Sequence, residues 1–523
     1  MKNFLAMSLG ALLIVGSTTG AAAAGRIDFN GVYRMQFNNV WNYNYGAKGA
    51  SSLPLTVAGG APYGVQSNLW DRSPNAFDRH NDSGFFNRLQ LNFAFHATDE
   101  VSVFWRLRAP NSQRWGTNDL TAVTDYVYGQ VNQDWGTAMV GRFYGGSDLG
   151  LVTAGLKPAG VDDNFTFPNP FQLGNRAFDG IRYANRWDSG FHLLAQFNRL
   201  TTTPTVSENA DLFTLQPSYF WEGGAAGLGL SYLRDRSGDS NPSPLALTDV
   251  ILNMFYINPF ITHDWGNGWR TSFAGKAGWG QLDGWGPAPN TFFATNVDYK
   301  VSGYAAYADV NYNYGQGNVN LAAWWASGNK ENWNKNPPPG TSTKASAGDF
   351  HGMVGMGQDF APLMLAYGGN ALPRVNNLKG GAVQIANAHS GHAAQMIRNS
   401  LNDGGDSANH WAAVISGNQT LTNDINLTYA LGYLSLVKNR QGTSKDIGTE
   451  IDLGLHFKLL DNLEFRTTVA YLFAGKALDG VDDRYFLIRN STGTPSTTGS
   501  PSVPVGYKAD DAMGWYNCLV FSF

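Results

Sequence analysis

The stretch Asp511–Phe523 (DAMGWYNCLVFSF) decides the fold. Successive side chains of a β-strand point to opposite faces, so a spacing of two residues marks one face. One face of this stretch carries Leu519, Phe521 and Phe523, and the other carries Gly514, Tyr516, Cys518 and Ser522. The first face suits contact with lipid. The pattern predicts a terminal transmembrane β-strand; the alternative is an ordinary edge strand that ends in Phe.

The amino-terminal segment has the pattern of a secretory signal peptide. Lys2 is followed by an apolar stretch, Phe4–Val15, and by the small residues Ala21–Ala24, the order in which such peptides are built. We therefore expect a signal peptide over residues 1–24 and a mature domain over residues 25–523. Beyond the signal peptide, no apolar run approaches the roughly 20 residues that a membrane-spanning helix needs. An exported chain of this kind can cross a membrane as a closed β-barrel, because every backbone group is then paired.

The composition agrees with a barrel rather than a soluble enzyme. Charged residues make up 15% of the chain and aromatic residues 13%, whereas soluble domains carry about a quarter charged residues. The net charge of −4 at pH 7 argues against a nucleic-acid partner. The single cysteine, Cys518, excludes an intrachain disulfide framework and a CxxC metal site, and we expect it to be a structural residue on an inward-facing strand position.

Alternation with a period of two recurs along the chain and is interrupted by short polar turns. In the first mature strand Ile27, Phe29 and Tyr33 alternate with polar residues such as Arg34, which predicts apolar side chains outside and polar side chains inside. Eight short turns predict eight hairpins: 98–100, 133–136, 187–190, 221–225, 264–268, 314–317, 421–424 and 460–462. With a first and a last strand that close on each other, an all-β transmembrane antiparallel barrel of 18 strands is expected, or of 16 if one hairpin is miscounted.

The segments between these hairpins are much longer than the turns. The longest are 38–84, 280–299, 329–409 and 474–510, and short turns on one side with long loops on the other are typical of periplasmic and extracellular ends. Segment 329–409 includes a possible short helix, Ala382–Leu401. It could fold over the barrel mouth or extend into solvent, and both readings stay open at this point. No plug domain of roughly 100 residues precedes the first strand, which disfavours an energised receptor.

Two motifs resemble those of Gram-negative outer-membrane porins. The chain's ending resembles the signal that outer-membrane barrels present to the barrel-assembly machinery, which would make Leu519, Phe521 and Phe523 the assembly signal. Asp134–Gly145 (DWGTAMVGRFYG) resembles the stretch that precedes the inward-folded third loop of general diffusion porins. The resemblance implies that Tyr144–Gly174 is a constriction loop. It also implies a homotrimer in the outer membrane lipid of a Gram-negative bacterium.

A pore constriction follows from this resemblance together with strand parity. The basic wall is predicted from arginines assigned to the lumen: Arg34, Arg88, Arg106, Arg108, Arg142 and Arg176. The acidic side would come from the constriction loop, through Asp148, Asp162 and Asp163. The family places acidic residues near the loop tip, whereas this tip carries Asn169 and Pro170, which puts the acidic half in doubt. Guanidinium groups stay charged, so such a gap would filter solutes by size and charge.

The leading hypothesis is therefore a water-filled channel for passive diffusion of small hydrophilic solutes and ions, without a cofactor, a metal or catalysis. The alternatives are a selective channel for sugars or for carboxylates and other anions, and a barrel that anchors the envelope or houses a partner protein. Phe104, Tyr126 and Tyr128 are possible inward aromatic residues for a selective channel. No GxSxG, HExxH, P-loop or CxxCH motif is present. Loop histidines such as His389 and His392 make a metal site conceivable, but solvated histidines are the simpler reading.

Overall fold

The structure is a computed structural model of the chain. It describes residues 25–41, 82–108, 113–114, 123–144, 177–202, 209–235, 251–285, 297–328, 351–352, 362–367, 409–438, 444–479 and 509–523. The predicted signal peptide, residues 1–24, lies outside this part. No helix among the described residues is long and apolar enough to cross a membrane.

The described chain is almost entirely β-strand, apart from one short 3₁₀ helix, η3 (Lys476–Leu478). The first ten strands are β1 (Arg26–Trp41), β2 (Asp82–His96), β3 (Val101–Arg108), β4 (Gln113–Arg114), β5 (Val123–Gln133), β6 (Gly136–Tyr144), β7 (Ala177–Arg186), β8 (Phe191–Thr202), β9 (Asn209–Trp221) and β10 (Gly224–Asp235). The others are β11 (Ile251–Gly266), β12 (Trp269–Trp285), β13 (Val297–Asn313), β14 (Gly317–Ala326), β15 (His410–Thr422), β16 (Ile425–Leu436), β17 (Asp446–Leu460), β18 (Leu463–Ala474) and β19 (Ala512–Ser522).

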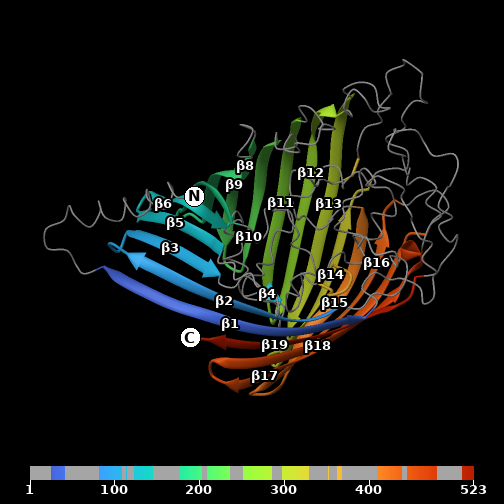
Figure 1. Ribbon diagram of the computed structural model, residues 1–523. Coiled ribbons are helices and arrows are strands. Elements are labelled where there is room, and N and C mark those ends of the chain that lie inside the picture. The colour runs from blue at the N-terminus through green and yellow to red at the C-terminus, as the bar shows by residue number, and fades with distance from the viewer. Residues whose placement is uncertain are drawn as a thin grey trace, which may run out of the picture.

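These strands form one antiparallel sheet that closes on itself. Apart from the short β4, each strand pairs with the strands before and after it, and β1 pairs with β19 to complete the ring, so the first and last strands lie side by side in Figure 1. The two-residue strand β4 pairs with β2 on the same side as β3 does. Together β3 and β4 therefore fill one strand position of the barrel wall. The 19 strands of the sheet therefore occupy 18 positions, which confirms the predicted 18-strand barrel rather than the 16-strand alternative.

All eight predicted hairpin turns join consecutive strands of the ring. The turn between β11 and β12 shows why its residues suit it: Asn267 and Gly268 both have positive φ, 51° and 84°, as a tight hairpin turn requires. The backbone carbonyl of Asn313 also lies where a side chain at position 268 would begin. Short turns gather at one end of the barrel, and the longer connections leave from the other end.

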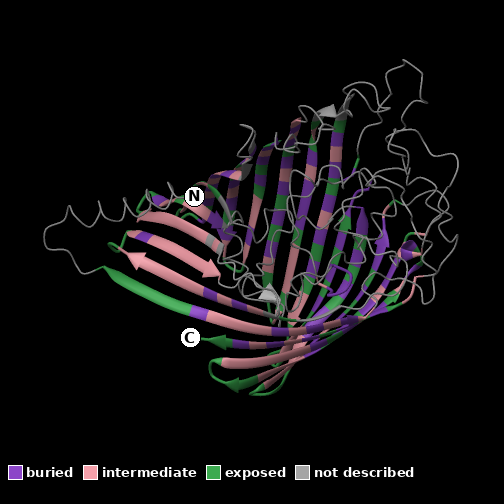
Figure 2. Ribbon diagram, viewed as in Figure 1, coloured by how far each residue is buried: buried purple, intermediate pink, exposed green. Residues whose placement is uncertain are grey.

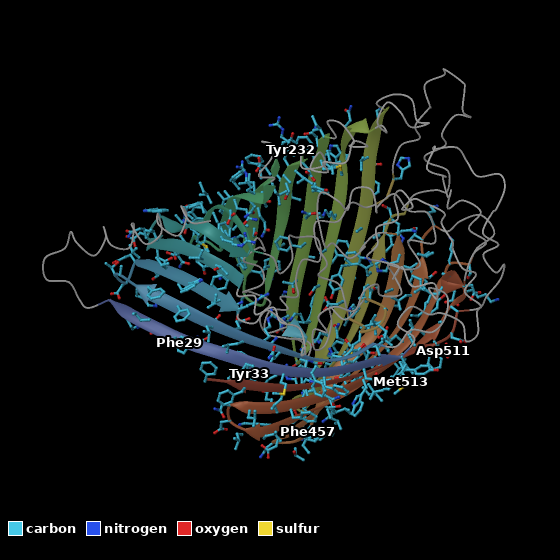
Figure 3. The ribbon with its side chains drawn as sticks, in the orientation of Figure 1. Phe29, Tyr33, Tyr232, Phe457, Asp511 and Met513 are labelled. Atoms are coloured by element: carbon cyan, nitrogen blue, oxygen red, sulfur yellow. The ribbon has the colours of Figure 1, made fainter. Side chains whose placement is uncertain are left out.

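The two faces of the wall differ as alternation predicts. Buried and exposed residues alternate along β11 to β13 (Figure 2), and the exposed ones include Phe255, Phe273 and Tyr304. Side chains project from both surfaces of the wall (Figure 3). Polar side chains such as Gln216 and Asn258 face inward and are buried. A barrel with an apolar outside and a polar inside is the arrangement of transmembrane barrels.

The carboxyl-terminal strand closes the barrel with the predicted orientation. Cys518 is buried on the inner face, whereas Leu519 and Phe521 share the outward face. The last residue, Phe523, exchanges backbone hydrogen bonds with Gly31 of β1, at 2.8 and 3.0 Å. The predicted assembly-signal residues thus lie at the seam where the first and last strands meet.

Candidate pore constriction

A row of arginines crosses the inner face of the first three barrel strands. Arg34 of β1 and Arg88 of β2 are direct register partners near the middle of their strands. On β3, Arg108 lies opposite Gln90 and Arg106 lies opposite Asn92. Arg88 is only 6% exposed. Like charges at directly opposite positions destabilise a sheet, so this pair of positions favours negative charge beside it.

Arg106 is held in place by two neighbours. Its Nε donates a hydrogen bond to Oδ1 of Asn92 at 2.6 Å, and its guanidinium carbon lies 4.6 Å from the ring centre of Tyr126. Tyr126 in turn packs 5.6 Å from Tyr128, whose ring stacks on Phe104 at 5.2 Å. The three inward aromatic residues proposed from the sequence therefore form one cluster beside the arginine row.

The basic character extends to β7. Arg182 faces inward and is nearly buried, opposite Gln196 of β8. Among the side chains described on the inner face of β1 to β8, Asp28 is the only carboxylate, and it lies at the turn end, paired with Arg26 and His96. The side chains described on this part of the inner face therefore carry a net positive charge.

Carboxylates face the lumen on the far side of the ring. Asp235 of β10 and Asp309 of β13 are buried inward-facing residues. Between their strands lies β12, which is nine positions from β2 in the ring of 18 and therefore stands diametrically opposite it. Lys276 of β12 shares this side, with its Nζ 4.2 Å from the ring centre of Tyr256. The described inner faces of β10 to β13 thus carry both signs of charge, whereas the described inner faces of β1 to β3 carry mainly arginines.

A short piece of the long segment 329–409 lies inside the barrel. Residues 362–367 are fixed to two inward carboxylates of β17: the backbone N–H groups of Leu365 and Ala366 donate to Glu450 at 2.6 Å each, and that of Met364 donates to Asp452 at 3.2 Å. We name residues 362–367 the inner segment.

Side-chain packing completes the attachment of the inner segment. The hydroxyl of Tyr367 lies 3.1 Å from Nε2 of His410 on β15. Leu363 occupies the space beside Gly432 of β16, where a Cβ would lie 2.5 Å from the leucine Cδ1. Residues 363–367 are all buried. The inner segment therefore narrows the lumen along β15 to β17. These residues of segment 329–409 fold back onto the barrel rather than extend into solvent.

Four residues of the predicted basic wall lie on the inner face and one does not, and their role in a constriction stays a prediction. Arg34, Arg88, Arg106 and Arg108 face the lumen, as described above. Arg142 does not: it lies opposite Val127 and Asp179, on the same face as Val140, which is 59% exposed to the outside. The inward residues of β6 are its neighbours, such as the buried Phe143. The remaining predictions lie outside the described residues: Arg176, Asp148, Asp162, Asp163 and the third loop.

The lumen carboxylates were missed from the sequence. Glu450 and Asp452 sit two residues apart in an alternating strand, which places both on one face, so parity alone could have found them. What parity could not supply is their partner, because Leu365 is separated from Glu450 by 85 positions. Among the described residues, no group of three His, Cys, Asp or Glu side chains could hold a metal ion.

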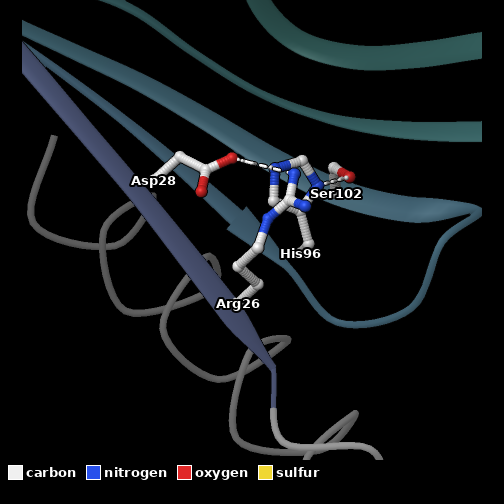
Figure 4. Close-up of polar contacts among 4 residues, drawn as sticks. All are labelled: Arg26, Asp28, His96 and Ser102. Atoms are coloured by element: carbon white, nitrogen blue, oxygen red, sulfur yellow. Dashed lines mark hydrogen bonds and ion pairs between the residues drawn. The ribbon is translucent and has the colours of Figure 1, made fainter.

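A second polar cluster lies at the turn end of β1 to β3 (Figure 4). Nδ1 of His96 is 2.8 Å from the hydroxyl of Ser102, and Nε2 is 3.2 Å from Oδ2 of Asp28. Arg26 pairs with the same carboxylate at 2.9 Å. His96 and Ser102 are register partners. Alternation in β2 predicts His96 on the lumen face, whereas its contact with Asp28 depends on the pairing of β1 with β2.

The sequence matches no protein-family model and no curated protein. Solved structures that match over nearly the whole chain include OccK2 (OpdF) of Pseudomonas aeruginosa, with 10% identity, 97% of this chain and 99% of that chain covered, and a TM-score of 0.45. An anion-selective porin from Comamonas acidovorans matches with 10% identity, 95% and 100% coverage, and a TM-score of 0.39. OmpT, an outer membrane protein of Vibrio cholerae, matches with 11% identity, 97% and 100% coverage, and a TM-score of 0.37. These likenesses carry no argument about function. Strand pairing, closure and the two contrasting faces make this chain a closed 18-strand antiparallel β-barrel.

Proposed function

We propose that the protein is an outer-membrane channel through which small hydrophilic solutes diffuse passively, with a preference for anions. The observation that carries the proposal is the arginine row on the inner face of β1 to β3, with Arg34 and Arg88 at opposite register positions. In a narrow water-filled passage the local field outweighs the net charge of the chain. Transport needs no chemistry, so we propose neither catalysis nor a cofactor.

The stacked aromatic residues favour small carboxylates among the anions. Arg106 is pre-oriented by Asn92 and Tyr126, and a guanidinium binds a carboxylate through two parallel hydrogen bonds. The rings of Phe104 and Tyr128 lie beside it and offer an apolar surface for the rest of such a solute. A selective channel is thus a finer form of the same proposal.

The first test is the conductance of the purified protein in a planar bilayer under a salt gradient. The proposal predicts an open, ohmic conductance and a reversal potential displaced toward the chloride equilibrium potential. Replacing Arg34 and Arg88 together by Gln should move the reversal potential toward the cation value, whereas the matched change Lys458→Gln at a turn should leave it in place. A complete lack of conductance would refute the channel and favour an anchoring or scaffold role.

We further propose a homotrimer that reaches the outer membrane of a Gram-negative bacterium through a cleaved signal peptide and the barrel-assembly machinery. The support is the sequence pattern of residues 1–24 and the outward Leu519 and Phe521 beside the closing seam. Mass spectrometry of the mature protein should find Gly25 as its first residue. Native mass spectrometry should find three chains.

Ester hydrolysis is a second candidate function, favoured by one observation, the Asp28, His96 and Ser102 cluster. Its chain of contacts has the order of a catalytic triad, in which a carboxylate orients the histidine and the histidine takes the serine proton. Against it, Ser102 is only 4% exposed. A fluorophosphonate probe should therefore leave Ser102 unlabelled, and labelling that disappears in Ser102→Ala would establish the hydrolase instead.

A further inference from the structure

A row of polar side chains runs along the outer face of the barrel, at the end from which the long connections leave. Its members are consecutive register partners on eight neighbouring strands, β6 to β13: Arg142, Asp179, Arg199, Asp211, Arg234, Asn253, Gln281 and Lys300. We name these eight residues the outer rim row. Arg142 lies two residues before the end of β6, and Asp179 two residues after the start of β7.

The position of the row fits a membrane boundary. An outward arginine or lysine costs about 2–4 kcal/mol at the bilayer midplane but only about 0–1 kcal/mol near the interface. Along β11, the outward residues below Asn253 are apolar, beginning with Phe255 and Ile257. The row therefore marks the height at which lipid head groups replace acyl chains.

The two halves of the row differ in how their charges are satisfied. In the first half Arg142 pairs with Asp179 at 3.7 Å, and Arg199 pairs with Asp211 at 2.8 Å. The second half, Arg234 to Lys300, contains no carboxylate. Arg234 and Lys300 are exposed, and neither forms an ion pair with another described residue.

The two amides between these cations are also available as donors. The hydroxyl of Tyr232 donates to Oδ1 of Asn253 at 3.0 Å, which leaves the amide nitrogen of Asn253 turned away from Tyr232. Gln281 is exposed at the next register position. Four neighbouring strands therefore present two cations and two amides at one height, and strands lie about 4.8 Å apart, so the set spans roughly 14 Å. Such a set suits phosphate oxygens.

An apolar groove lies directly below this set. One register step down, the outward residues form an aromatic row, in which Phe197, Phe213, Tyr232 and Phe255 follow one another with ring-centre distances of 5.1, 6.3 and 4.6 Å. Tyr232 lies near the rim (Figure 3). The groove has a volume of ≈ 780 Å³ and extends from Ile181 to Trp279, which is within the range of about 300–1,000 Å³ typical of ligand sites.

We infer that this face binds a phosphate-bearing lipid of the outer leaflet. Its phosphate would contact Arg234, Asn253, Gln281 and Lys300, and an acyl chain would lie in the groove along Phe213 and Phe255. Charge complementarity selects this occupant: the second half of the row holds Arg234 and Lys300 without a carboxylate, and an anionic head group neutralises them. The site is on the outer wall and is separate from the proposed passage.

The test is native mass spectrometry of the delipidated protein in detergent with added lipid A, a phosphorylated glycolipid that carries acyl chains. Wild type should retain lipid A, and the double variant Arg234→Ala, Lys300→Ala should bind it at least tenfold more weakly. A matched pair of exposed cations at the turn end, Arg26→Ala with Lys458→Ala, should bind as wild type does. Ala195→Trp, which fills the floor of the groove, should also weaken binding.

Three outcomes would overturn the inference. Dephosphorylated lipid A bound as tightly as the phosphorylated form would remove the role of the cations. Inorganic pyrophosphate that competes fully at the same concentration would show an anion site without a lipid component. If wild type takes up no lipid and the double variant loses its oligomeric state, this face is a contact between copies of the chain. Equal thermal unfolding temperatures of wild type and variants would show that each variant folds.

Discussion

The attachment of the inner segment to Glu450 gives the most direct test of the lumen geometry. The change Glu450→Gln keeps the size of the side chain and removes one of its two acceptor oxygens. In the wild type these oxygens accept the backbone N–H groups of Leu365 and Ala366, both at 2.6 Å. In the variant one of these N–H groups faces an amide NH₂ group, which cannot accept it.

The magnitude follows from that single bond. Leaving a buried N–H group without an acceptor costs about 1–3 kcal/mol. Every 1.4 kcal/mol changes an equilibrium constant tenfold. The variant should therefore increase the population of the detached inner segment by roughly 10- to 100-fold. Asp452 still accepts the N–H group of Met364 at 3.2 Å, so the segment should detach transiently rather than permanently.

Cysteine labelling measures this population. The chain has one cysteine, Cys518, which is buried, so Met364→Cys in a Cys518→Ala background provides one reporter inside the buried segment. When reattachment is faster than labelling, the rate of reaction with a charged thiol reagent follows the detached population. Glu450→Gln should raise that rate roughly 10- to 100-fold.

The matched control is Glu464→Gln. Glu464 is another lumen carboxylate, but its partner is Arg466 of the same strand, so this change should leave the labelling rate as it is. Equal labelling rates for Glu450→Gln and its parent would show that the carboxylate does not hold the inner segment, and the proposed narrowing along β15 to β17 would then lose its support.

Further predictions concern the turns and the arginine row. Gly268→Ala should destabilise the barrel more than Gly266→Ala in urea unfolding. Both glycines have positive φ, which costs an alanine about 1–2 kcal/mol, but only a side chain at position 268 also meets a backbone carbonyl. Equal losses of stability would contradict this. The ion pair with Lys458 holds the pKa of Asp461 below its usual value. This ion pair is therefore present at neutral pH and is lost as the pH falls through the lowered pKa of Asp461. Because both groups are exposed, Asp461→Asn should leave the unfolding temperature unchanged at pH 7. Arg106→Gln should reduce block of the current by a small aromatic carboxylate, and undiminished block would exclude the cluster as a solute site.

The barrel itself could be predicted from the sequence because its signals are local. Period-two alternation identifies each strand, and a two- or three-residue polar turn identifies each hairpin, so Asn267 and Gly268 or Asp461 and Asn462 suffice without knowledge of distant residues. The strand count followed from these turns alone. The inner segment has no such local signal, because its position depends on carboxylates about 85 residues away and on the space that Gly432 leaves.

The face of Arg142 was mispredicted because polar and apolar residues do not alternate cleanly in β6, whose inward positions include the apolar Met139 and Phe143. In β6, Thr137 bonds to Asn132 inside the barrel and Phe143 is buried, and these odd positions place Arg142 outside. The argument that charged side chains avoid lipid holds at the midplane, but it weakens within two residues of a strand end, where an outward arginine costs little. Near a rim, alternation should therefore take precedence over charge in assigning a face. Applied to β6 through β13, that rule finds the whole outer rim row, including the exposed cations Arg234 and Lys300.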